Sequence, residues 1–165
     1  MTELFSADDV FQAALRMENN GAEFYRRAAS KVTSARADIK NLFNKLAAME
    51  DAHTQTFAKL HRELNENENK QTKFGPKDES LLHLKVLVDV GVFFKKKVNL
   101  SSLKEVFKAA IEAERDSIVF YLSMREMVPE TGKNRIDLII KEEMKHIHLL
   151  GKELTAIKHD SDSSI

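Results

Sequence analysis

Four long segments of the chain place apolar residues at alternating steps of three and four, and this spacing constrains the fold more than any other feature. It keeps one stripe of a helix facing a shared core. The pattern predicts helices over about 7–32, 35–65, 102–128 and 134–158, with Pro129 and Gly132 ending the third. Only 5 glycines and 2 prolines occur among the 165 residues, so few positions interrupt a helix. We therefore expect an all-α chain.

The connections between the predicted helices differ in length. Short loops join the first helix to the second and the third to the fourth, whereas the middle connection covers residues 66–101. This asymmetry predicts a four-helix bundle of two antiparallel hairpins with a long crossover. An apolar stretch at 81–94 predicts an extra short helix in the crossover, which either packs over the end of the bundle or forms a dimer contact. We expect one domain over 1–158 and a disordered polar tail at 159–165.

The two predicted hairpins repeat the same residues in register. In the first and third helices the pairs are Ala14 with Ala110, Glu18 with Glu114, Gly21 with Ser117, Phe24 with Phe120, and Tyr25 with Tyr121. In the second and fourth helices the pairs are Leu46 with Ile139, Glu50 with Glu143, His53 with His146, and Phe57 with Leu150. The match indicates two copies of one helical hairpin, related by a pseudo-twofold axis.

Ionisable residues interrupt all four apolar stripes. Each stripe contains an acid, and the second and fourth also carry a histidine three residues later. Positions i and i+3 of a helix lie roughly 60° apart, so each histidine points to the same side as its acid. We predict that six such residues face the interior: Glu18, Glu50, His53, Glu114, Glu143 and His146. Burying an isolated carboxylate costs several kcal/mol, so something must neutralise these acids.

Two divalent cations would balance the charge of the four carboxylates. The stripes contain no Lys or Arg near the level of the acids, and protonation alone would not explain the histidines or the repetition of the pattern. Oxygen and nitrogen donors without sulfur suit iron or manganese, and zinc also binds such sites. A Glu from two helices and a Glu-x-x-His from two others is the arrangement of ferritin-like di-iron and di-manganese proteins. The sequence therefore predicts a two-metal centre.

The composition excludes several other classes of protein. The 26 basic residues balance 26 acidic ones, so the chain lacks the dense positive field that makes nucleic acid or an anionic membrane the default partner. The absence of cysteine excludes disulfides, cysteine-based zinc sites and iron–sulfur clusters. The first residues lack the features of a signal peptide, and the stretch at 81–94 is short for a membrane span. We expect a cytoplasmic protein with no membrane-spanning segment.

The residues around the predicted ligands resemble the rubrerythrin branch of the ferritin-like superfamily. The resembling segments are Met17–Tyr25, Ala48–His53, Ala113–Tyr121 and Glu142–His146. The resemblance implies a carboxylate-bridged di-iron site that reacts with hydrogen peroxide or dioxygen. It implies the six residues as metal ligands and catalytic residues, with Glu50 and Glu143 bridging the ions, Glu18 and Glu114 as terminal ligands, and His53 and His146 each on one ion.

Two departures from the rubrerythrin pattern bear on the source of electrons and on the ligand set. A chain without cysteine cannot form the rubredoxin-like domain that feeds electrons to the di-iron centre of rubrerythrins. Ser117 stands where those proteins carry an additional carboxylate, one turn after the third-helix Glu. The ligand set is closer to the erythrin or ferritin type. Electrons would then come from an external donor protein or from Fe²⁺ itself.

Three further residues lie near the predicted ligands in the sequence. Tyr25 and Tyr121 each follow a predicted ligand Glu by seven residues and share its helix face. They are either core aromatics or hydroxyl donors to a metal ligand. Glu142 adjoins Glu143 but points about 100° away, so we expect it to be solvated.

These observations favour a di-iron oxidoreductase that reduces hydrogen peroxide or dioxygen with electrons from an external donor, as a peroxidase or ferroxidase. We expect a homodimer. One alternative is a non-catalytic bundle that binds or stores iron. Another is a helical interaction module with a vestigial metal site, in which the helix at 81–94 is the working surface.

Overall fold

A computed structural model describes residues 6–66, 84–87 and 98–159. The long elements are the helices α1 (Ala7–Lys31), α2 (Ala37–Glu66), α4 (Leu103–Arg125) and α5 (Glu130–His159), with a 3₁₀ turn, η1 (Ser34–Arg36), before α2. Residues 84–87 are also helical, and the described ranges contain no strand. The all-α prediction is confirmed.

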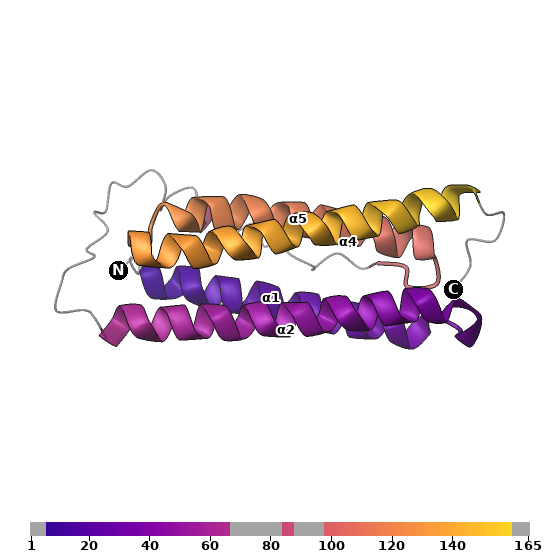
Figure 1. Ribbon diagram of the computed structural model, residues 1–165, viewed down its shortest axis with the longest axis horizontal. Coiled ribbons are helices and arrows are strands. Elements are labelled where there is room, and N and C mark those ends of the chain that lie inside the picture. Colours follow the sequence, from indigo (N-terminus) through magenta and orange to yellow (C-terminus); the bar gives the residue numbers. More distant parts are fainter. Residues whose placement is uncertain (1–5, 67–83, 88–97, 160–165) are drawn as a thin grey trace.

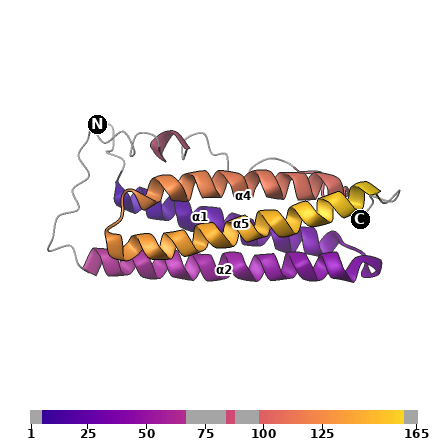
Figure 2. The same cartoon turned by 45° about the horizontal axis from the view of Figure 1, so that its top comes forward.

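The four long helices form two antiparallel hairpins (Figure 1). In that view α1 and α5 run from left to right, whereas α2 and α4 run from right to left. Figure 2 shows the same pairs from another side, with α1 along α2 and α4 along α5. The turn of the first hairpin lies at one end of the bundle and the turn of the second at the other, as a pseudo-twofold relation between them requires.

Two serines begin helices by accepting backbone hydrogen bonds. The Asp9 amide donates to Ser6 Oγ over 3.3 Å, and the Ser6 amide donates to Asp9 Oδ2 over 2.7 Å, so both orphan donors are satisfied. The Glu105 amide donates to Ser102 Oγ over 3.4 Å at the start of α4. These caps explain why the predicted starts of α1 and α4 agree with the structure to within a residue or two.

The turn between α4 and α5 differs from the prediction. The sequence pattern extends the third helix to about 128 and begins the fourth at about 134, but α4 ends at Arg125 and α5 begins at Glu130. Pro129 precedes the first turn of α5, and its carbonyl accepts from the Gly132 amide over 2.8 Å. Gly132 therefore lies inside a helix. A Cβ there would be 3.2 Å from Leu60 Cδ1, so the glycine permits close packing against α2.

Apolar side chains form two core clusters, one toward each end of the bundle. One includes Phe11, Phe57 and Met124, and the other includes Phe43 and Phe107. The predicted ligands occupy the middle of each helix, between these clusters. They are therefore enclosed by apolar packing on two sides.

Only parts of the predicted crossover and tail lie within the described residues. Leu84 is fully buried in one core cluster, so the described part of the 81–94 segment packs on the bundle. The rest of that segment, the remainder of the crossover outside 98–101, and residues 160–165 lie outside the described ranges. Among the helices that are described, none is both long enough and apolar enough to cross a lipid bilayer.

Candidate metal centre

The structure brings all six predicted ligands together at the centre of the bundle. We call them the carboxylate–histidine cluster: Glu18, Glu50, His53, Glu114, Glu143 and His146. None of the six is more than 3% exposed. One acid comes from α1 and one from α4, and a Glu-x-x-His comes from each of α2 and α5.

Donor atoms of the cluster form two overlapping groups. Glu18 and His53 belong to the first group, and Glu114 and His146 belong to the second. Glu50 and Glu143 belong to both, and within each group the four donor atoms lie within 4.8 Å of one another. Each group could therefore hold one metal ion, with two carboxylates shared between the ions.

The histidines present the same ring nitrogen to the carboxylates. His53 Nδ1 lies 3.1 Å from Glu143 Oε1 and 3.3 Å from Glu18 Oε2. His146 Nδ1 lies 3.0 Å from Glu143 Oε2 and 3.3 Å from Glu50 Oε1. The rings are 5.8 Å apart between centroids and are inclined by 20°. Nδ1 is the donor atom that each imidazole offers toward the centre of the cluster.

Several buried polar atoms of the cluster have no hydrogen-bond partner among the described residues. They are Glu18 Oε2, Glu50 Oε1, both carboxylate oxygens of Glu143, Nδ1 of His53, and both ring nitrogens of His146. The imidazole contacts of 3.0–3.4 Å bring these atoms close without aligning them as hydrogen bonds. Buried polar atoms in native proteins are almost always paired. Cations at the centre would satisfy all of these atoms except Nε2 of His146, because each imidazole offers Nδ1 to the carboxylates. Oxygen and nitrogen ligands fit divalent iron or manganese.

The electrostatics of the ion-free cluster show how strongly its groups are coupled. Burial opposes the charge on the imidazoles, but neighbouring carboxylates outweigh it and raise the pKa of His53 to about 11 and that of His146 to about 12. Burial, and repulsion by other carboxylates, raise the pKa of Glu50 and Glu114 well above the ordinary value. Burial opposes ionisation of Glu143 too, yet contact with both imidazoles holds its pKa well below the ordinary value. Without a cation, the cluster retains protons.

Metal binding should therefore displace protons. With a pKa of about 11 and 12, both imidazoles are protonated at pH 7 in the ion-free protein, and a metal ion binds only the unprotonated nitrogen. We expect each bound ion to release at least one proton, and the metal affinity to fall as the pH is lowered. Calorimetric titration in buffers of different ionisation enthalpy measures this release. Heats that do not depend on the buffer would contradict the expectation.

Comparison with known proteins assigns the chain to a family. The model of the rubrerythrin family matches residues 9–154, a range that contains the whole cluster. The chain belongs to the rubrerythrin family. A solved structure from Thermotoga maritima, described as that of a ferritin-like diiron-carboxylate protein, is 25% identical with a TM-score of 0.64, over 98% of this chain and 100% of that chain. No curated protein matches. The predicted ferritin-like fold is confirmed.

Two tyrosines of this rubrerythrin-family chain connect the hairpins through the cluster. The Tyr25 hydroxyl donates to Glu114 Oε1, and the Tyr121 hydroxyl donates to Glu18 Oε1. Burial, and the nearby carboxylate of the bonded Glu, raise the pKa of each phenol well above its ordinary value, so both hydroxyls stay protonated. Each tyrosine thus orients an acid of the opposite hairpin.

Ser117, which stands where rubrerythrins carry an additional carboxylate, does not offer its side chain as a metal ligand. Its buried hydroxyl donates to the Ala113 carbonyl over 3.0 Å, within its own helix. The matching position in α1 is Gly21, which has no side chain to offer. The donor set is therefore equal in the two hairpins.

Glu142 keeps the solvent exposure that the sequence predicts, but it also makes a contact with His53 that the sequence does not predict. Its side chain is 44% exposed, but its Oε2 lies 2.7 Å from His53 Nε2. The contact joins α5 to α2 and lies on the side of the imidazole that faces away from the cluster. Helical periodicity describes faces within one helix, so it carries no information on a contact across two hairpins.

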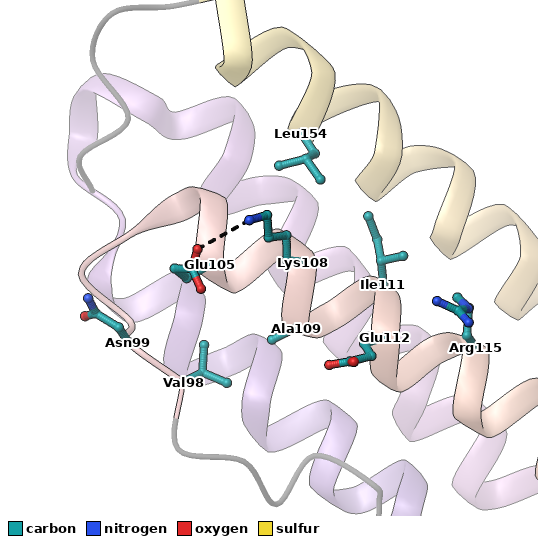
Figure 3. A pocket seen from close by; sticks show the side chains of 9 residues that line it. All are labelled: Val98, Asn99, Glu105, Lys108, Ala109, Ile111, Glu112, Arg115 and Leu154. Carbon is teal, nitrogen blue, oxygen red and sulfur yellow. Dashed lines mark ion pairs between the residues drawn. The ribbon is translucent and has the colours of Figure 1, made fainter.

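A surface cavity of about 580 Å³ lies along the first half of α4 (Figure 3). Its lining includes Glu105, Lys108, Ile111 and, from α5, Leu154, with Glu105 and Lys108 paired over 3.7 Å. None of the cluster residues lines it. The candidate metal centre is therefore built inside the bundle and not in this cavity.

Proposed function

We propose that the carboxylate–histidine cluster holds two iron ions and that the protein reduces hydrogen peroxide or dioxygen. The observation that carries this proposal is the pair of overlapping donor groups, which share Glu50 and Glu143. Membership of the rubrerythrin family supports it. So does the likeness to a structure described as a ferritin-like diiron-carboxylate protein.

In this proposal the six ligands form three pairs, each with its own role. Glu50 and Glu143 would each hold both ions, since each belongs to both donor groups. Glu18 and Glu114 would each hold one ion, and the tyrosine hydroxyls orient these two carboxylates. His53 and His146 supply neutral nitrogen donors through Nδ1. Four carboxylates then balance the four positive charges of two divalent ions.

The protein supplies geometry and exclusion of water. Two Fe²⁺ ions would supply the two electrons that, with two protons from solvent, reduce one hydrogen peroxide to two waters. Apolar clusters on both sides of the site keep bulk water from the ligands. A lower local dielectric strengthens the attraction between the carboxylates and cations. The chain has no cysteine to hold an electron-transfer centre, so we assign the supply of electrons to an external donor protein or to Fe²⁺.

Stopped-flow oxidation of the Fe²⁺-loaded protein tests this function. The ion-free protein is loaded anaerobically with two Fe²⁺ per chain, then mixed with hydrogen peroxide in one experiment and with dioxygen in another. We expect oxidation much faster than that of free Fe²⁺ in the same buffer, followed by renewed oxidation after chemical reduction.

The Glu143→Gln variant should lose the rapid phase, because one of the two shared carboxylates is gone. Glu153→Gln removes a carboxylate from the same helix about 15 Å away and should behave as the wild type. Two bound irons that oxidise no faster than free Fe²⁺ would refute catalysis and favour storage.

A further inference from the structure

The two halves of the cluster differ at Nε2 of their histidines, the ring nitrogen that is not directed at the carboxylates. His53 presents Nδ1 to the cluster, and its Nε2 lies 2.7 Å from the carboxylate of Glu142. A carboxylate only accepts hydrogen bonds, so Nε2 of His53 carries the proton of this bond. The neutral imidazole is then the tautomer whose Nδ1 lone pair points into the cluster.

His146 has no such support in the described part of the chain. Its Nε2 is buried and has no hydrogen-bond partner there. Glu142 immediately precedes Glu143, and the residue that precedes Glu50 in the matching repeat is Met49. A thioether is at best a weak acceptor, so methionine cannot replace a carboxylate in this role. The two hairpins have equal ligands, but they differ at this position next to a ligand.

A carboxylate on the distal nitrogen changes how well an imidazole binds a metal ion. It fixes the tautomer and the orientation of the ring and makes the ligating nitrogen more basic. Removing such a partner typically weakens metal binding by about 10–100-fold. The half-exposed carboxylate of Glu142 also adds negative charge beside only one of the two donor groups.

We propose that Glu142 is a positioning residue that makes the two metal positions unequal, so that the position at Glu18 and His53 binds its ion more tightly and fills first. The proposal rests on the two-metal centre proposed above. It adds that the pseudo-symmetric ligand set holds two ions of different affinity.

Two variants isolate the halves of the cluster. Glu114→Gln leaves intact the donor group of Glu18 and His53, and Glu18→Gln leaves intact the donor group of Glu114 and His146. Glutamine still accepts the tyrosine hydroxyl but is a poor metal ligand. Each ion-free variant is titrated anaerobically with Co²⁺, and binding is followed by visible absorbance and calorimetry. We expect Glu114→Gln to bind Co²⁺ about 10–100-fold more tightly than Glu18→Gln.

Adding Glu142→Gln to both backgrounds tests the cause of the difference. In Glu114→Gln it should weaken Co²⁺ binding by about 10–100-fold, and in Glu18→Gln it should have little effect. Glu153→Gln, added as a matched control, should change neither. As a single substitution in the wild-type protein, Glu142→Gln should weaken binding of the first Co²⁺ ion more than binding of the second. This measurement checks the inference without the half-site variants.

The outcomes separate this inference from the proposed metal centre. Equal Co²⁺ affinities in the two half-site variants, or equal weakening of both by Glu142→Gln, would overturn the inequality. The centre itself would stand if the wild type still binds two Co²⁺ ions. A wild-type protein that binds no Co²⁺ would refute both.

Discussion

The Glu50→Ala variant is expected to lose two-metal occupancy altogether. Glu50 belongs to both donor groups, so its removal takes a ligand from each ion at once. Removing a hydrogen-bond partner of a metal ligand typically lowers the metal affinity by about 10–100-fold, and removing a shared ligand should lower it more. Metal analysis after anaerobic loading with Fe²⁺ and desalting should find no more than one ion per chain.

The Glu18→Ala variant provides the comparison. Glu18 belongs to one donor group only, so this variant should keep the ion bound by Glu114 and His146. Both substitutions remove one buried acid from the cluster, and so differ chiefly in whether that acid is shared. Wild-type occupancy in Glu50→Ala would remove the bridging role assigned to that residue.

A large rise in thermal stability is expected when the cluster binds metal. Ions that bind the folded chain stabilise it by about 4 kcal/mol per site at a concentration 1,000 times the Kd. For a domain of this size, each kcal/mol raises Tm by about 2–4 °C. Two filled sites should therefore raise Tm by on the order of 20 °C. Thermal unfolding followed by circular dichroism, with excess Co²⁺ or with chelator, measures the shift.

Magnesium separates site binding from a general effect of divalent ions. Mg²⁺ prefers an octahedral shell of oxygens and keeps several waters, so a dry cluster with two imidazoles suits it poorly. It should raise Tm far less than Co²⁺ at the same concentration. Glu50→Ala should also lose most of the Co²⁺ effect. An identical Tm for the wild type in Co²⁺ and in chelator would argue against metal binding by this cluster.

The sequence predicts the helices and the cluster well because both depend on relations within one helix. The three-and-four spacing extends over segments of 23 to 30 residues, which is long enough to identify helices with little ambiguity. The acids and histidines stand out because each interrupts an apolar stripe, and because the interruption recurs in the second hairpin. Burial of all six residues follows from this pattern.

What the sequence pattern does not predict depends on contacts between helices. The sequence pattern places Gly132 at the end of a helix, but the residue lies within α5, where its lack of a side chain leaves room for Leu60 of α2. Glu142 points away from Glu143 along its own helix, yet its carboxylate reaches His53 on the other hairpin. The periodicity of α5 carries no information on Leu60 or His53, because both belong to α2. The inequality proposed for the two metal positions therefore depends on the packing of the hairpins as well as on the difference between Glu142 and Met49.

The number of metal ions bound per chain tests the central claim most directly. The protein is stripped with chelator, loaded anaerobically with Fe²⁺, desalted, and analysed by mass spectrometry for iron and by absorbance for protein. Two overlapping donor groups predict close to two irons per chain. Protein that retains no iron would contradict the claim that the buried acids and histidines of this rubrerythrin-family chain form a metal centre.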